Sequence, residues 1–313
     1  MPALTWILFS LVVTTALNLA HASYPMQAQQ VAKNVYAIIT PTRDLPNPEN
    51  RGWNSNSAFV ITQDGVLLFD SGSSTDIGMA LKQTIAAVTD KPVRWIINSH
   101  AHGDHWLGNA AFKDSVEQIY ASDLVAKTIK VGGRSWIDLF NRMTLGATGE
   151  SEIVPPNTYI NESTTLNLGG TSMELFPSAN SHSPGDLILW LPDQRILISG
   201  DVVYSDRMPS TNAGTLRNWI ELLDQLQARQ PQVVIPGHGA VTDSAGLKRL
   251  QSLLQALWQA VEEGYEAGLS DYEMLPRVTE ALSSFASDFP GLEDKLKRDI
   301  SHVFLQVEAA SFE

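Results

Sequence analysis

The chain has 313 residues, and its 34 acidic and 21 basic side chains give a formal net charge of −13 at pH 7. Such an acidic surface repels phosphate backbones, so nucleic acid is not expected as a partner. Hydrophobic residues at 43% and charged residues at 18% are typical of a globular protein, which excludes wholesale disorder and a protein with several membrane spans. Cysteine is absent, which excludes disulfides, thiolate metal ligands and a cysteine nucleophile.

Residues 1–22 have the composition of a secretory signal peptide. They contain no Lys, Arg, Asp or Glu, hold an apolar run from Leu4 to Leu17, and end in the small-x-small pattern Ala20-His21-Ala22. The run is short for a membrane span. We therefore predict cleavage before Ser23 and a periplasmic or secreted mature protein without a membrane span. An uncleaved anchor is the alternative.

The first half of the mature chain is rich in short β-strands. The runs VYAIIT, SAFVIT and VLLFDSG predict strands at residues 35–40, 57–62 and 66–72, with Asp64-Gly65 as the hairpin turn between the last two. Helical spacing follows at residues 75–88. The apolar run at residues 92–98 predicts a buried strand that opens into the loop AHGDHWLGN. A functional site is expected in that loop.

The second half repeats this pattern after an interruption. Residues 130–158 contain several glycines and prolines and are predicted to be an irregular insertion that covers a pocket. Strands are then predicted at residues 171–179, 186–192 and 195–202, and helices at residues 215–230, at residues 247–261 and in the remainder to Glu313. Two β-rich halves with helices predict two facing sheets with helices outside. We expect one hydrolase domain at residues 23–240, with a helical part at residues 241–313 packed on it.

Histidines are concentrated in the sequence His100-Ala101-His102-Gly103-Asp104-His105. In a loop that leaves a strand, the first two imidazoles can face one metal ion, and the Asp104 and His105 side chains can bend toward a second. Three further candidates, His182, Asp201 and His238, each lie at a strand end or in a loop with Gly or Pro. His302 has no such companion, and we assign it no role.

The motifs HAHGDH, HSPGD, SGD and PGHG, in this order and spacing, resemble the metallo-β-lactamase superfamily. The resemblance covers the chain from about Val31 to Ala240 and implies an αββα four-layer sandwich. It implies that His100, His102 and His182 hold a first metal ion, that Asp104, His105 and His238 hold a second, and that Asp201 bridges the two. The strand-end residue Asp70 matches a supporting position of the family.

Two divalent ions at such a site would lower the pKa of a bridging water toward about 7, so that hydroxide attacks an ester, thioester, lactone or amide carbonyl of a small-molecule substrate. Two Zn²⁺ ions are expected, with iron or manganese as alternatives. Asp104 is expected to orient the nucleophile and carry its proton. Tyr204, three residues after Asp201, is predicted either to polarise the substrate carbonyl or to pack in the core.

The ligand set resembles glyoxalase II and the lactonases more than the dedicated β-lactamases. The stretch GDVVYSDRMPS and the leader look most like the exported zinc metallohydrolases called quinoprotein relay system proteins. Arg207 is then a candidate for a substrate carboxylate, with a surface ion pair as the alternative. Trp53 and Trp106 are candidates for pocket walls, with the core as the alternative.

Three other functions remain open at this point. They are β-lactamase-type activity, mononuclear iron oxygenation of sulfur compounds, and a non-catalytic metal-binding role as an accessory protein of a periplasmic quinoprotein system. The complete ligand set argues against the accessory role, because a purely structural site would not require all seven positions.

Overall fold

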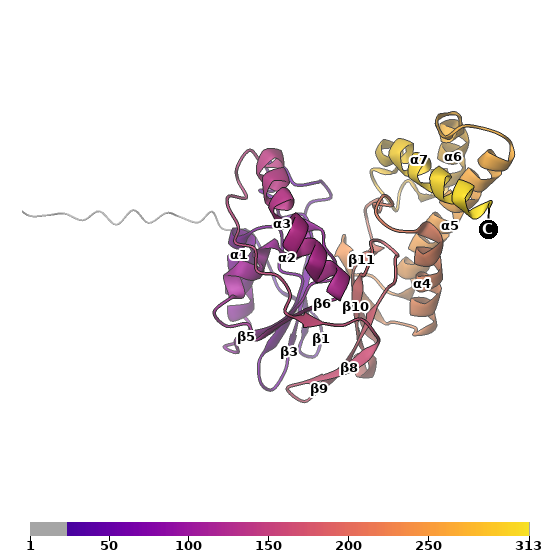
Figure 1. The fold of residues 1–313 in the computed structure, drawn as a ribbon. Helices are drawn as coiled ribbons and strands as arrows, with labels where there is room; N and C mark the ends of the chain where they lie inside the picture. The colour runs from indigo at the N-terminus through magenta and orange to yellow at the C-terminus, as the bar shows by residue number, and fades with distance from the viewer. Residues whose placement is uncertain (1–23, 313) are drawn as a thin grey trace, which may run out of the picture.

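A computed structural model describes residues 24–312, and the predicted signal peptide lies outside this part of the chain. Figure 1 shows two central sheets, with α1 and α3 on one side and α4 to α7 on the other. This arrangement confirms the predicted four-layer sandwich with additional C-terminal helices.

The first sheet has seven strands in chain order, β1 to β7. The first four pair antiparallel, and β4 to β7 pair parallel. The predicted turn at Asp64-Gly65 joins β3 and β4, as expected. The strands are β1 (Gln29–Ala32), β2 (Val35–Ile38), β3 (Ser57–Ile61), β4 (Val66–Phe69), β5 (Val93–Ile97), β6 (Gln118–Ala121) and β7 (Thr158–Tyr159).

The second sheet has five strands in the order β12-β11-β10-β9-β8. Only β11 and β12 pair parallel, and the other neighbours pair antiparallel. A one-turn 3-10 helix at Pro192–Gln194 connects β10 and β11. The strands are β8 (Thr164–Leu168), β9 (Thr171–Pro177), β10 (Leu187–Leu191), β11 (Ile196–Tyr204) and β12 (Val233–His238).

The hydrophobic core has separate layers. Leu67 and Phe69 of the first sheet pack with Leu175, Leu189 and Ile235 of the second to form the layer between the sheets. The alternate face of the first sheet packs on α1 (Thr75–Ala86). The outer face of the second sheet packs on α4 (Leu216–Ala228) and α5 (Ser244–Glu266). Because these strands are buried on both faces, their sequences are continuous apolar runs.

One prediction of local structure is wrong. Residues 130–143 are not irregular but belong to α3 (Asp123–Met143), which begins at the N-cap Ser122. The paired glycines suggested a break, but a side chain at Gly133 would meet the Trp106 ring 2.9 Å away. Close packing of α3 on α2 (Gly103–Trp106) therefore outweighs the low helix propensity of glycine. Only residues 144–157 have the predicted irregular structure.

The helices after β12 pack in the same hydrophobic cluster as the outer face of the second sheet. They are α5, α6 (Leu275–Leu282) and α7 (Leu292–Ala310), with short 3-10 helices at Asp271–Met274 and Ser283–Phe285. The predicted apolar stripe of α7 is buried at Leu296, Ile300 and Val303. Within residues 24–312, no helix combines the length and the hydrophobicity of a membrane span.

Candidate metal centre

All seven predicted metal ligands lie at one end of the two sheets. His100, His102, Asp104 and His105 follow β5 or belong to the short α2, and His182 lies in the loop between β9 and β10. Asp201 is within β11, and His238 is the last residue of β12. Gly237 precedes His238 because a side chain there would meet the Asp201 carboxylate. The ligands therefore come from both halves of the chain.

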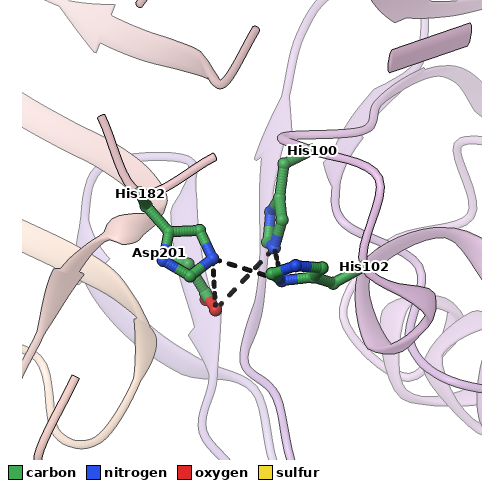
Figure 2. A group of neighbouring side chains, drawn as sticks. All are labelled: His100, His102, His182 and Asp201. Carbon is green, nitrogen blue, oxygen red and sulfur yellow. Dashed lines mark hydrogen bonds and ion pairs between the residues drawn. The ribbon is translucent and has the colours of Figure 1, made fainter. Parts of the chain in front are cut away.

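The first group consists of His100, His102, His182 and Asp201, which point toward a common centre (Figure 2). His102 Nδ1 lies 2.9 Å from His100 Nε2 and 3.2 Å from His182 Nε2. Asp201 Oδ2 lies 3.6 Å from His182 Nε2 and 3.8 Å from His100 Nε2. These separations are close to the edge of a tetrahedron with metal–nitrogen bonds of about 2.0–2.1 Å.

The second group consists of Asp104, His105 and His238. Asp104 Oδ2 lies 3.6 Å from His105 Nε2 and 3.5 Å from His238 Nε2. Asp201 lies between the two groups, with Oδ1 3.2 Å from His105 Nε2 and Oδ2 3.3 Å from His238 Nε2. The two groups, each of which could hold a metal ion, are therefore neighbours, and Asp201 lies between them.

Several imidazoles are oriented through the ring nitrogen that faces away from the cluster. His105 Nδ1 lies 2.8 Å from Asp70 Oδ2, His100 Nδ1 lies 2.9 Å from Ser99 Oγ, and His238 Nδ1 lies 2.7 Å from the Asn54 carbonyl oxygen. An Nδ1–H that donates to an oxygen leaves the Nε2 lone pair directed at the cluster. Asp70 also accepts hydrogen bonds from the backbone N–H and hydroxyl of Ser99, which agrees with its predicted supporting position.

Burial and charge set the protonation of the ligands. Burial lowers the pKa of His182 to about 3 and, with the neighbouring histidines, lowers the pKa of His100 well below its usual range, so both rings are neutral. Burial opposes ionisation of Asp201, but His238 and His105 hold the pKa of its carboxyl well below the usual range. Against the effect of burial, the surrounding carboxylates raise the pKa of His105. Neutral imidazoles and ionised carboxylates are the forms that bind metal, so binding of a metal ion at His105 would release its proton.

The donor set fits divalent metal ions. His105 Nε2 and Asp201 Oδ1 are buried, and neither has a hydrogen-bond partner among residues 24–312. Buried polar atoms normally have a hydrogen-bond partner. These two atoms face each other from different groups, and their lack of a partner indicates that metal ions would bind there. The imidazole-rich donor set is typical of zinc, and the added carboxylates are compatible with iron or manganese.

A cavity of about 300 Å³ opens onto the centre. Asp104, His102, Asp201 and His238 form its base, and the predicted residues Tyr204 and Arg207 line it. Neither Trp53 nor Trp106 does so: both are buried in hydrophobic clusters beneath the first sheet and α3, in agreement with the alternative core role. The cavity wall contains instead Trp136, Leu139, Phe140 and Met143 of α3, from the helix that the sequence did not predict.

The sequence analysis also missed the buried segment Asn54-Ser55-Asn56. Asn54 Nδ2 donates to Asp104 Oδ2 at 3.0 Å, and the Ser55 hydroxyl donates to the Asp104 carbonyl at 2.6 Å. Asn56 bonds to the backbone on both sides of His238. Three consecutive polar residues at the entrance to an apolar strand were a signal that buried hydrogen bonding was required there.

Comparison with known proteins agrees with this geometry. The sequence model of the metallo-beta-lactamase superfamily matches residues 50–238. A metallo-beta-lactamase type 2 of Bacillus sp. strain 170 is 26% identical over 64% of this chain and 73% of its own. A linear primary-alkylsulfatase of a Pseudomonas species is 25% identical over 63% of this chain, but over only 43% of its own length.

Solved structures have the same fold. The metallo-beta-lactamase of Pontibacter korlensis aligns with a TM-score of 0.60 at 22% identity, covering 74% of this chain and 99% of its own. The inverting sec-alkylsulfatase Pisa1 of Pseudomonas sp. aligns with a TM-score of 0.65 at 14% identity, covering 90% of this chain and 50% of its own.

A four-layer sandwich with clustered His and Asp side chains at one sheet end defines a class of metal-binding hydrolases. The chain belongs to the metallo-beta-lactamase superfamily, as its motifs predicted, and is a hydrolase of that superfamily.

Proposed function

We propose that the protein is an exported binuclear zinc hydrolase that cleaves an ester, thioester, lactone or amide carbonyl of a small-molecule substrate. The observation that carries this proposal is the position of Asp201 between two complete ligand groups, 3.2 Å from His105 Nε2 and 3.6 Å from His182 Nε2. The leader composition supports export, and the cavity over the centre has a size suited to a small molecule. Iron and manganese remain alternative metals.

When bound, two such ions supply a nucleophile at neutral pH and polarise the substrate carbonyl. The protein's own contribution is orientation. Asp104 lines the cavity, where its carboxylate accepts a proton from the nucleophile and returns it to the leaving group. The His105 and His238 side chains hold the pKa of Asp104 below its usual value in spite of burial, so that the carboxylate starts the cycle ionised.

For Tyr204 we propose a positioning role instead of the predicted carbonyl polarisation. Its hydroxyl donates a short hydrogen bond to Asp201 Oδ2, and its ring stacks on His238 with centroids 5.2 Å apart. Burial and the Asp201 carboxylate raise the pKa of Tyr204 well above its usual range, so the phenol stays protonated and remains a donor. We assign Tyr204 to holding the shared carboxylate in position.

Arg207 supports a substrate with an anionic group. Its side chain is 6% exposed, lines the cavity and has no carboxylate within ion-pair distance among residues 24–312. Its Nη1 lies 3.0 Å from His238 Nδ1, and its Nε has no hydrogen-bond partner there. A buried guanidinium without a counter-charge is costly, and a substrate carboxylate would provide one in bidentate geometry. The predicted alternative, a surface ion pair, is not found in the described structure.

A second candidate is hydrolysis of a sulfate ester. The observation that favours it is the combination of Arg207 on one cavity wall with the apolar side chains of α3 on another, which suits an alkyl chain with an anionic head. The similarity to an alkylsulfatase points in the same direction. β-Lactamase activity, sulfur oxygenation at a single iron, and a non-catalytic accessory role in a quinoprotein system are the other outcomes to be separated.

The test is metal content per chain by elemental mass spectrometry on mature protein purified without chelator. The same sample is assayed against a lactone, a thioester, a chromogenic β-lactam and an alkyl sulfate. About two zinc ions per chain are expected, with turnover of a carbonyl substrate that Asp201→Ala lowers by about 10³-fold or more.

Each other outcome selects a different function. Turnover of the alkyl sulfate alone selects the sulfatase, and turnover of the β-lactam alone selects the lactamase. One iron per chain selects the oxygenase. Two zinc ions with no turnover of any of the four substrates favours the accessory role and contradicts the proposed activity.

A further inference from the structure

The segment Asn54-Ser55-Asn56 joins the two halves of the molecule beside the second metal group. It precedes β3 of the first sheet, yet the Asn56 N–H donates to the Gly237 carbonyl at 2.8 Å. Asn56 Nδ2 donates to the Pro236 carbonyl at 2.9 Å and to the Gly239 carbonyl at 2.8 Å. These bonds fix the segment to the end of β12, on both sides of His238.

From this fixed position Asn54 contacts two ligands of the same metal group. Its side-chain Nδ2 donates to Asp104 Oδ2 at 3.0 Å, and its backbone oxygen lies 2.7 Å from His238 Nδ1. Asp104 lies in α2, after β5 of the first sheet, whereas His238 ends β12 of the second sheet, and the two are 134 positions apart in the chain. No residue of the first metal group is a hydrogen-bond partner of Asn54 among residues 24–312.

We propose that Asn54 is a positioning residue for the second metal ion, which holds Asp104 and His238 at ligating distance without being a ligand. The inference rests on the proposed binuclear function. The hydrogen bond keeps Asp104 Oδ2 3.5 Å from His238 Nε2 and 3.6 Å from His105 Nε2. Without it, Asp104 is free to turn away from Asp201, a carboxylate of like charge in the same buried site.

The side chain offers a clean substitution because Asp104 is its one hydrogen-bond partner in the described structure, and Asn54 Oδ1 has none. Asn54→Leu keeps nearly the same shape and leaves the backbone carbonyl on His238 unchanged. The variant therefore removes the Asp104 contact alone. Asn212 is a control in the same cavity, since it belongs to neither metal group and its Oδ1 accepts a hydrogen bond from the Ser210 hydroxyl.

The experiment measures stepwise Zn²⁺ affinity of the full-length mature protein by competition with a chromogenic chelator. The absorption spectrum of the Co²⁺-substituted protein reports the coordination of each site. In Asn54→Leu, we expect the second Zn²⁺ to bind about 10–100-fold more weakly while the first binds as in the wild type. Asn212→Leu should bind both ions like the wild type. Asn54→Ala serves as the second variant if the leucine disturbs folding.

Two results would overturn the role of Asn54 and leave the binuclear function intact. One is unchanged affinity of Asn54→Leu for both Zn²⁺ ions, and the other is an equal loss of Zn²⁺ affinity at both sites, which would show a general structural role. Recovery of the second affinity in Asn54→Gln, whose amide can again reach Asp104, would support it. Binding of a single Zn²⁺ by the wild-type protein would instead overturn the binuclear function together with this assignment, so the two failures are distinguishable.

Discussion

The metal ligands and the cavity wall are two regions of one site that are held in different ways. Asp201 and His238 lie in strands, the other candidate ligands lie in the segments that follow β5 and β9, and hydrogen bonds to oxygens of Asp70, Ser99 and Asn54 orient three of the imidazoles. The wall consists of α3 and of residues 205–215, which follow β11 as a loop. A strand end is fixed by its neighbours in the sheet, whereas a loop depends on what packs behind it.

Behind the loop lies α7. Lys295 Nζ donates to the Met208 carbonyl at 2.6 Å. Gln306 accepts a hydrogen bond from the Leu216 N–H at 2.8 Å and donates to the Gly214 carbonyl at 3.1 Å. The C-terminal helices therefore support the part of the wall that carries Arg207. Metal binding and substrate fit therefore depend mainly on different residues, with Arg207, whose Nη1 lies 3.0 Å from His238 Nδ1, at the boundary between them. Most substitutions should affect one property more than the other.

The largest expected effect is on the ligand side. His105→Ala should remove one of two bound zinc ions and lower turnover by about 10³-fold or more, because the second ion loses a ligand. His302→Ala is the control, since His302 lies on α7 at the wall and belongs to neither metal group. Elemental analysis that finds equal zinc in wild type and His105→Ala would contradict the assignment of the second site.

A second prediction concerns the support of the His182 loop. Asp186 accepts hydrogen bonds from Ser181 and Ser183, and burial raises its pKa from an ordinary 3.8 to about 6. Because the folded pKa is higher, the stabilising contribution of the protonated carboxyl is complete below pH 3.8 and is lost as the pH rises through about 6. Relative to Asp186→Asn, the wild type should therefore lose about 3 kcal/mol of unfolding free energy between these pH values.

The measurement is denaturant unfolding of the wild type and Asp186→Asn in the same zinc-containing buffer at each pH. Because metal binding contributes equally to both proteins, its pH dependence cancels in the difference between their unfolding free energies. A difference that does not change with pH, or that changes in the opposite direction, would mean that the serine hydrogen bonds keep the carboxyl ionised.

On the wall, Arg207→Gln should weaken binding of a carboxylate-bearing substrate or product about tenfold or more, with zinc content unchanged. The reason is the loss of the buried guanidinium charge in the cavity, whose Nε has no hydrogen-bond partner in the described structure. Calorimetric titration of 4-phenylbutyrate against the neutral 4-phenylbutanol checks this. Arg217→Gln, an exposed arginine over Trp258, is the control. Equal weakening for acid and alcohol would argue that Arg207 acts only through packing.

The smallest expected effect is at the support of the wall. Gln306→Ala should raise KM about fivefold through loss of about 1 kcal/mol of net hydrogen bonding, with kcat and zinc content nearly unchanged. Steady-state kinetics measures the split, and Gln259→Ala on the exposed face of α5 is the control. A fall in kcat or zinc with unchanged KM would mean that α7 supports the ligands rather than the wall.

The candidate ligands could be predicted from local sequence pattern. His100 to His105 lie in one short motif, and His182, Asp201 and His238 lie in or after apolar strands, so this pattern was enough to predict a candidate ligand set and the fold. The helices with strong apolar periodicity, such as α5 and α7, were predicted for the same reason.

The cavity wall and the contacts that orient the candidate ligands depend on tertiary packing. The α3 helix continues through the paired glycines, and Gly133 packs on Trp106, a contact that no local propensity encodes. Trp53 and Trp106 have the composition of pocket residues but lie in the core, whereas Trp136 takes the place at the cavity. Asn54 contacts Asp104 and His238 across the two sheets, and contacts between segments so distant in the chain form only when the whole fold is assembled.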